Sequence, residues 1–97
     1  MRLLVTRPHP QAGETAERLR ALGHAVRVAP LLDIVPDPDV TLAPDGADLV
    51  VLTSRGAVRA LTRHRELDRV RGLPTLAVGE ATAAAARAAG FSDVRAA

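Results

Sequence analysis

Apolar residues along this chain alternate between short strand-like runs and helix-like spacings. Leu3, Leu4 and Val5 form a continuous apolar run, as do residues 49–52, and such runs are typical of strands buried in a parallel sheet. In the segments between these runs, apolar residues stand three and four positions apart, which predicts helices. We expect strands at residues 2–6, 25–29, 48–53 and 73–78, helices at residues 11–22, after Ser54 and at 80–89, and a last strand beginning within 92–95. This order predicts an α/β protein with parallel sheets flanked by helices.

The first predicted helix has a clear apolar face and a clear end. Ala12, Ala16, Leu19 and Leu22 fall near one face at spacings of three and four. Gly23 follows directly, and glycine suits the left-handed position just beyond a helix. We therefore expect this helix to pack through those four side chains and to stop at Gly23.

The later helices also carry boundary residues. Ser54 is a good N-cap for the second helix. Residues 63–71 are rich in charge and are interpreted as the end of that helix and a turn. Gly90 followed by Phe91 predicts a stop in which Phe91 packs back onto the last helix.

A proline-rich stretch separates the two halves of the pattern. Pro36, Pro38 and Pro44 interrupt any regular element, and aspartates and a glycine lie among them. The preceding Leu31–Val35 is apolar and is interpreted as extended. Two arrangements stay open, namely separate α/β units on either side of the linker or one merged sheet of four or five strands.

Composition narrows the classes of function. The 97 residues include 13 basic and 11 acidic side chains, for a formal charge of +2, and the two signs are interleaved. A nucleic-acid-binding protein more often shows a basic stripe with aromatic stacking residues, whereas Phe91 is the single aromatic residue here. The lack of Cys and Lys excludes thiolate and Schiff-base chemistry and a phosphate-loop lysine. We therefore expect no nucleic-acid partner.

Membrane-spanning, secreted and metal-binding proteins have sequence patterns that this chain lacks. No apolar run approaches the roughly 18 residues of a membrane span, and none after Met1 resembles a signal peptide core. We expect a cytoplasmic protein without a membrane partner. His9, His24 and His64 show no metal-type spacing and are assigned to the surface, so no metal site is expected.

Three turns follow predicted strand ends, which is where parallel α/β sheets bind ligands. Each turn leads into a helix, and the free amides at a helix start favour an anion. Guanidinium groups in two of the turns match the geometry of carboxylates. The predicted ligand is therefore anionic, with several carboxylates. The substrate-binding candidates are Arg7, Thr53, Ser54, Arg55, Gly79 and Thr82.

These candidates also have ordinary structural explanations. The hydroxyls of Ser54 and Thr82 suit helix capping, and Arg55 suits a solvated helix face. Glu80 weighs against a tight anion site at the third turn because like charges repel. The sequence names no catalytic group.

Local sequences, in their joint order and spacing, resemble the uroporphyrinogen-III synthase family over nearly the whole chain. The matching segments are Leu4-Val5-Thr6-Arg7-Pro8, Ala21-Leu22-Gly23-His24, Ala29-Pro30-Leu31-Leu32, Asp48-Leu49-Val50-Val51-Leu52-Thr53-Ser54, Ala77-Val78-Gly79-Glu80-Ala81-Thr82-Ala83 and Gly90-Phe91-Ser92-Asp93-Val94. Two departures are visible. Gly56 stands where the family often has Asn, and the chain has no Tyr, whereas the family has a cleft tyrosine in its second half.

The resemblance implies two α/β domains with flavodoxin-like halves, joined by a two-stranded tether around the active-site cleft. Residues 1–35 would be the first strand–helix–strand of domain 1 plus a tether strand, and residues 36–97 part of domain 2. It also implies that the sequence is incomplete, the N-terminal portion of an enzyme about two and a half times as long.

The resemblance further implies a cyclising lyase of porphyrin and haem biosynthesis. Such an enzyme takes hydroxymethylbilane, a linear tetrapyrrole with eight carboxylates, removes water, inverts the last pyrrole ring and closes the macrocycle. It works as a monomer without a metal or organic cofactor, and the chain alone would be inactive. Arg7, Ser54 and Thr82 match cleft positions of the family. The alternative is a stand-alone α/β module that binds an anionic small ligand without catalysis.

Overall fold

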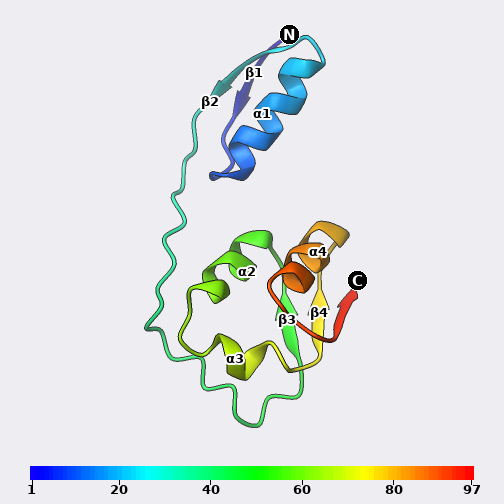
Figure 1. The fold of residues 1–97 in the computed structure, drawn as a ribbon. Helices are drawn as coiled ribbons and strands as arrows, with labels where there is room; N and C mark the ends of the chain where they lie inside the picture. Colours follow the sequence, from blue (N-terminus) through cyan, green and yellow to red (C-terminus); the bar gives the residue numbers. More distant parts are fainter. The chain divides into compact units, whose positions relative to one another are not determined.

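The computed structural model describes residues 1–97, which form alternating strands and helices (Figure 1). Contacts divide the chain into two compact units, Met1–Val35 and Pro36–Ala97. The elements are β1 (Arg2–Val5), α1 (Gln11–Ala21), β2 (Ala25–Val28), β3 (Val50–Leu52), α2 (Arg55–Thr62), α3 (Leu67–Val70), β4 (Thr75–Ala77), α4 (Glu80–Ala88) and β5 (Val94–Ala96).

The first unit is a strand–helix–strand motif. β1 and β2 pair in parallel, with Arg2 opposite Ala25 and Val5 opposite Val28. α1 connects them and packs on both strands, and Ala12 and Ala16 are fully buried in this contact. Alanine at these positions lets the helix approach the two-stranded sheet closely.

The end of α1 follows the predicted glycine stop. Gly23, at φ 92°, donates its amide to the carbonyl of Arg20, and His24 donates to the carbonyl of Leu19. These paired bonds are the Schellman arrangement that satisfies the last carbonyls of a helix. The expectation that Leu22 joins the apolar face is wrong, because Leu22 is the C-cap and its side chain is 73% exposed.

The second unit contains a three-stranded parallel sheet in the order β3-β4-β5. α2 and α4 pack on each other, α2 also packs on β3, and α4 packs on β4 and β5. Leu52, Val58, Val70, Ala86 and Phe91 form the buried core between these elements.

The last helix ends as predicted. The amide of Phe91 donates to the carbonyl of Ala86, and the amide of Gly90 donates to that of Arg87. This second Schellman arrangement turns the ring of Phe91 into the core, where it is only 4% exposed. Arg87 then reaches from α4 to the carbonyl of Val94 at the start of β5.

The stretch 63–71 differs from its prediction as a charged turn, because it includes the short helix α3. The charged residues of this stretch suggest that it is exposed to solvent. Leu67 and Val70, however, stand three positions apart and both pack in the core. Val70 is 5% exposed. Burial of these two side chains explains why a charge-rich segment becomes helical here.

The predicted fold class is confirmed, since all strand pairs are parallel and helices flank both sheets. The alternative prediction of one merged sheet of four or five strands is wrong, because the strands form two separate sheets. Leu31–Val35 lies outside any strand, so the tether strand stays a prediction. None of the helices has the length and apolar character needed to cross a membrane.

Candidate functional site

Two of the three candidate turns begin side by side at one edge of the second unit. β3 ends at Leu52 and β4 ends at Ala77, and these two residues are paired in the sheet. One residue further on, the amide of Val78 donates to the carbonyl of Leu52 at 2.8 Å. The turn that starts with Thr53 and the turn that contains Gly79 therefore leave neighbouring strands at the same level.

Ser54 caps α2, as the sequence predicts. Its backbone is extended (φ −154°, ψ 154°), and its hydroxyl oxygen accepts a hydrogen bond from the amide of Ala57 at 3.0 Å. Ser54 is exposed. The hydroxyl proton remains available to donate to an acceptor, because the cap uses only the oxygen as acceptor.

Gly79 forms the other turn with a backbone that favours glycine. Its φ is 90° and its ψ is 153°, and it occupies the N-cap position of α4 without a capping side chain. The amide of Ala83 donates to the carbonyl of Gly79 at 3.1 Å. The amides of residues 80–82 precede this bond, so the helix itself provides them with no acceptor. The free amides of a helix start favour an anion, and the exposed carboxylate of Glu80 in the same turn opposes one.

The remaining candidates of this unit differ in exposure. Thr53 is exposed and Arg55 is half-buried. Thr82 lies in the first turn of α4 and is only 6% exposed. Its side chain therefore packs into the unit, and the exposed polar groups at this edge are those of Thr53, Ser54 and the start of α4.

Arg7 lies in the other unit, two residues beyond the end of β1. Its side chain is exposed, and its Nη1 donates to the hydroxyl of Thr15 on α1 at 2.8 Å. The amide of Ala12 donates to the carbonyl of Pro8, which ties the turn after Arg7 to the helix. The guanidinium is thus held near the carboxyl end of β1.

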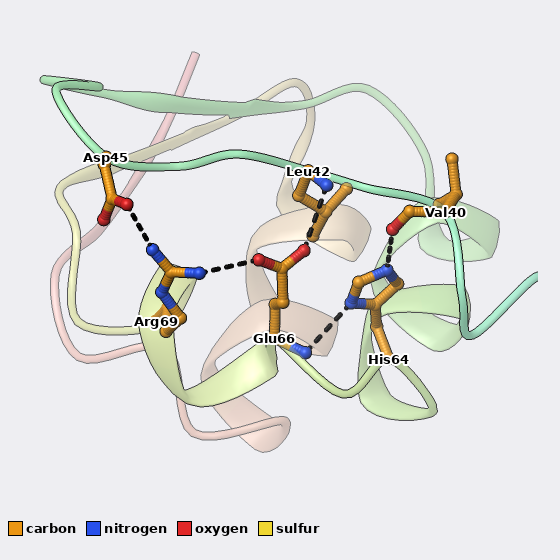
Figure 2. Close-up of polar contacts among 6 residues, drawn as sticks. All are labelled: Val40, Leu42, Asp45, His64, Glu66 and Arg69. Atoms are coloured by element: carbon orange, nitrogen blue, oxygen red, sulfur yellow. Dashed lines mark hydrogen bonds and ion pairs between the residues drawn. The ribbon is translucent and has the colours of Figure 1, made fainter.

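A second polar cluster lies away from the strand ends, in residues that the sequence did not indicate (Figure 2). His64 is 6% exposed, so its assignment to the surface is wrong. Its Nε2 donates to the carbonyl of Val40, and its Nδ1 accepts the amide of Glu66 at 3.0 Å. Burial of His64 depends on Val40, 24 residues upstream, and no local pattern reveals that partner.

The same cluster contains two carboxylates and one guanidinium. Glu66 Oε2 accepts the amide of Leu42 at 3.0 Å, and Glu66 Oε1 accepts from Arg69 at 2.8 Å. Arg69 also pairs with Asp45 at 2.5 Å. The hydrogen bond and charge of Asp45, with a smaller contribution from Glu66, raise the pKa of the Arg69 guanidinium above its ordinary value. The side chains in this cluster therefore hold one another, and no group of three or more metal-ligating side chains is placed to hold an ion.

Comparison with known proteins adds one match. A family model described as uroporphyrinogen-III synthase HemD matches residues 13–97. The match includes the turns at Thr53 and Gly79, and Arg7 lies before it. No curated protein matches the chain.

Proposed function

This chain belongs to the uroporphyrinogen-III synthase family, and we propose that it binds the linear tetrapyrrole hydroxymethylbilane for cyclisation to uroporphyrinogen III. The family is one of lyases in haem biosynthesis, which act on a small tetrapyrrole. The finer assignment adds the substrate contacts and the reaction steps. The reaction steps are loss of water, inversion of the last pyrrole ring and ring closure.

One observation carries the proposal for this chain. The bond from Val78 to Leu52 places two turns with unsatisfied or donating groups beside each other. A substrate with eight carboxylates needs several separate donors, and one helix start alone would hold a single carboxylate. Two neighbouring turns, each at the start of a helix, provide more hydrogen-bond donors with partial positive charge for an anionic substrate than one turn would.

Each candidate group has a proposed role. The exposed start of α4, at Glu80 and Ala81, binds one substrate carboxylate through its amides, and Gly79 allows that carboxylate to approach the backbone closely. Thr82 belongs to the same first turn. Thr53 and Ser54 donate hydroxyl protons, and Arg55 pairs with a second carboxylate. In the first unit Arg7 takes a further carboxylate, with Thr15 orienting its guanidinium.

These roles are binding and orientation, and they suit the reaction. Ring closure requires the two ends of a flexible chain to meet, so a surface that holds several carboxylates lowers the entropic cost of that geometry. Fixed donors also stabilise charge as water leaves. We further propose that residues 1–35 open one domain and residues 36–97 form part of a second. A monomeric, cytoplasmic enzyme without a cofactor stays the prediction from the family.

Calorimetry with uroporphyrin, a stable octacarboxylate, tests the binding surface. We expect Arg55→Ala and Ser54→Ala each to weaken binding, by about tenfold for the loss of a charge-assisted bond. Arg63→Ala is the matched control, because Arg63 is exposed at the opposite end of α2 and should leave binding nearly unchanged.

The outcomes separate the competing functions. Absence of binding, or equal losses from Arg55→Ala and Arg63→Ala, would remove the proposed surface. Formation of uroporphyrinogen III from hydroxymethylbilane, followed by product chromatography, tests catalysis separately. Tight binding without turnover under those conditions would favour the module that binds an anion without catalysis.

A further inference from the structure

Residues 40–45, which we term the strap, run across the second unit without forming a helix or strand. Most of the strap is open to solvent, since Val40 is 50% exposed and Asp45 has 88% of its side chain exposed. Pro44 is its single buried residue. Apolar burial within the strap is therefore confined to Pro44 and to Leu42, which is 36% exposed.

Polar attachments hold the strap instead, and they converge on one short stretch of chain (Figure 2). His64 donates to the carbonyl of Val40, Glu66 accepts the amide of Leu42, and Arg69 pairs with Asp45. Arg69 also donates to Glu66, which couples the second and third attachments. We term His64, Glu66 and Arg69 the latch.

Beneath the strap lies an apolar hollow of about 290 Å³. Leu42 and Pro44 of the strap line one side of it, and the other lining side chains are also apolar. They come from the approach to β3 and β3 itself (Ala47, Leu49, Val50, Val51, Leu52) and from Leu61, Val70 and Leu73. The strap thus borders an apolar hollow that is covered only in part, since Leu49 and Val51 of its lining are 49% and 55% exposed.

We propose that the strap is a latched cover, which opens as a local unit while the sheet and its helices stay folded. Segments with few buried apolar contacts open at lower free energy than the structure around them. The latch sets how often this happens, because His64, Glu66 and Arg69 make the polar attachments. Opening exposes more of the hollow, namely the part against Leu42 and Pro44, and frees the chain that leads into β3.

The chemistry of the latch makes the opening sensitive to salt. Asp45 and Arg69 form an ion pair with largely exposed side chains, and salt screens such pairs. The bond from His64 to Val40 is partly buried and responds less. Higher ionic strength therefore weakens one attachment and leaves another, so that the strap loosens from its Asp45 end.

Amide hydrogen exchange on the full chain tests the proposal. The amide of Leu42 reports the strap, and the amide of Val78, bonded to Leu52, reports the sheet. We expect Leu42 to exchange faster than Val78 in the unaltered chain. Glu66→Ala should speed exchange at Leu42 by about tenfold or more, as expected for a lost bond to a charged acceptor, and leave Val78 unchanged.

The matched control is Asp68→Ala. Asp68 pairs with Arg71 three residues away, in the same charged stretch but outside the latch. It should leave both amides unchanged. Equal protection of Leu42 and Val78 in the unaltered chain, or equal acceleration at both by Glu66→Ala, would overturn the proposal.

A milder variant covers the case in which Glu66→Ala unfolds the unit. Asp45→Asn removes the charge of an exposed side chain and should speed exchange at Leu42 by a few-fold, with Val78 unaffected. The fluorescent probe anilinonaphthalene sulfonate should bind the exposed hollow more strongly in Asp45→Asn than in Asp68→Ala. Unchanged exchange and equal probe binding in Asp45→Asn would contradict a latched cover.

Discussion

The amide of Val78 lies 2.8 Å from the carbonyl oxygen of Leu52 and extends the pairing of β4 with β3 by one residue. This bond decides that the Ser54 and Gly79 turns leave the sheet together. The proposed binding surface therefore depends on sheet register as much as on the side chains.

Gly79→Ala should destabilise the second unit through the backbone alone. A Cβ at this position would meet no atom within 4 Å, so the cost comes from φ 90°, which side chains rarely permit. We expect a loss of about 1–3 kcal/mol in the free energy of unfolding, measured by urea denaturation with circular dichroism. Gly72→Ala is the control, since Gly72 also has open space and no left-handed φ, and it should change stability by less than about 0.5 kcal/mol. Equal effects of the two variants would refute the strained turn.

Ser54 has a cap role and a proposed binding role, and two substitutions separate them. Ser54→Ala removes the acceptor for the amide of Ala57 and should cost about 1 kcal/mol of stability. Ser54→Asp restores a capping acceptor but adds negative charge, so stability should return while uroporphyrin binding falls further. Denaturation and calorimetry on both variants check this. Tighter binding by Ser54→Asp would contradict an anion-binding turn.

The two faces of β3 should respond differently to truncation. Leu52 is 3% exposed and belongs to the core, whereas its neighbour Val51 is 55% exposed. Leu52→Ala should lower stability by about 2–5 kcal/mol, enough to unfold a unit of this size, and Val51→Ala by less than about 1 kcal/mol. Thermal unfolding followed by circular dichroism measures both. A larger loss from Val51→Ala would show that the register of β3 is different.

Thr15 should influence ligand binding through Arg7. Thr15→Val removes the hydroxyl that accepts from Arg7 Nη1, so the guanidinium loses its fixed orientation. We expect uroporphyrin binding to weaken a few-fold, in keeping with about 1 kcal/mol for one hydrogen bond, and Arg7→Ala to weaken it more. Unchanged binding by Arg7→Ala would remove Arg7 from the proposed substrate contacts, whatever Thr15→Val does.

Local signals in the chain predicted most helix boundaries. Ser54 caps α2, and the glycines at 23 and 90 end their helices, because these outcomes depend on bonds between residues close in sequence. The predictions of burial were wrong for Leu22 and His64, the first for a local reason and the second because of a distant partner. Leu22 fits the apolar spacing, yet α1 ends before it can pack, and His64 is buried by a contact with Val40.

Some features of the candidate site could likewise be predicted from the sequence, and others could not. The residue types at the three turns, the anionic character of the expected ligand and the family resemblance were all visible in the amino-acid order. The register of the sheet was not visible, and it is the register that sets the turn starting with Thr53 beside the turn containing Gly79. Burial of Thr82 was not visible either.

For this protein the sequence alone determined the order of the strands and of every helix except α3, and it determined where α2 begins and where α1 and α4 end, because short-range sterics and capping bonds control these features. Only the tertiary structure decided that the strands form two sheets, which side chains are buried and that residues 40–45 attach to His64, Glu66 and Arg69. Those outcomes depend on contacts between residues far apart in the chain. Such contacts contribute to the free energy of folding only when the whole unit is assembled.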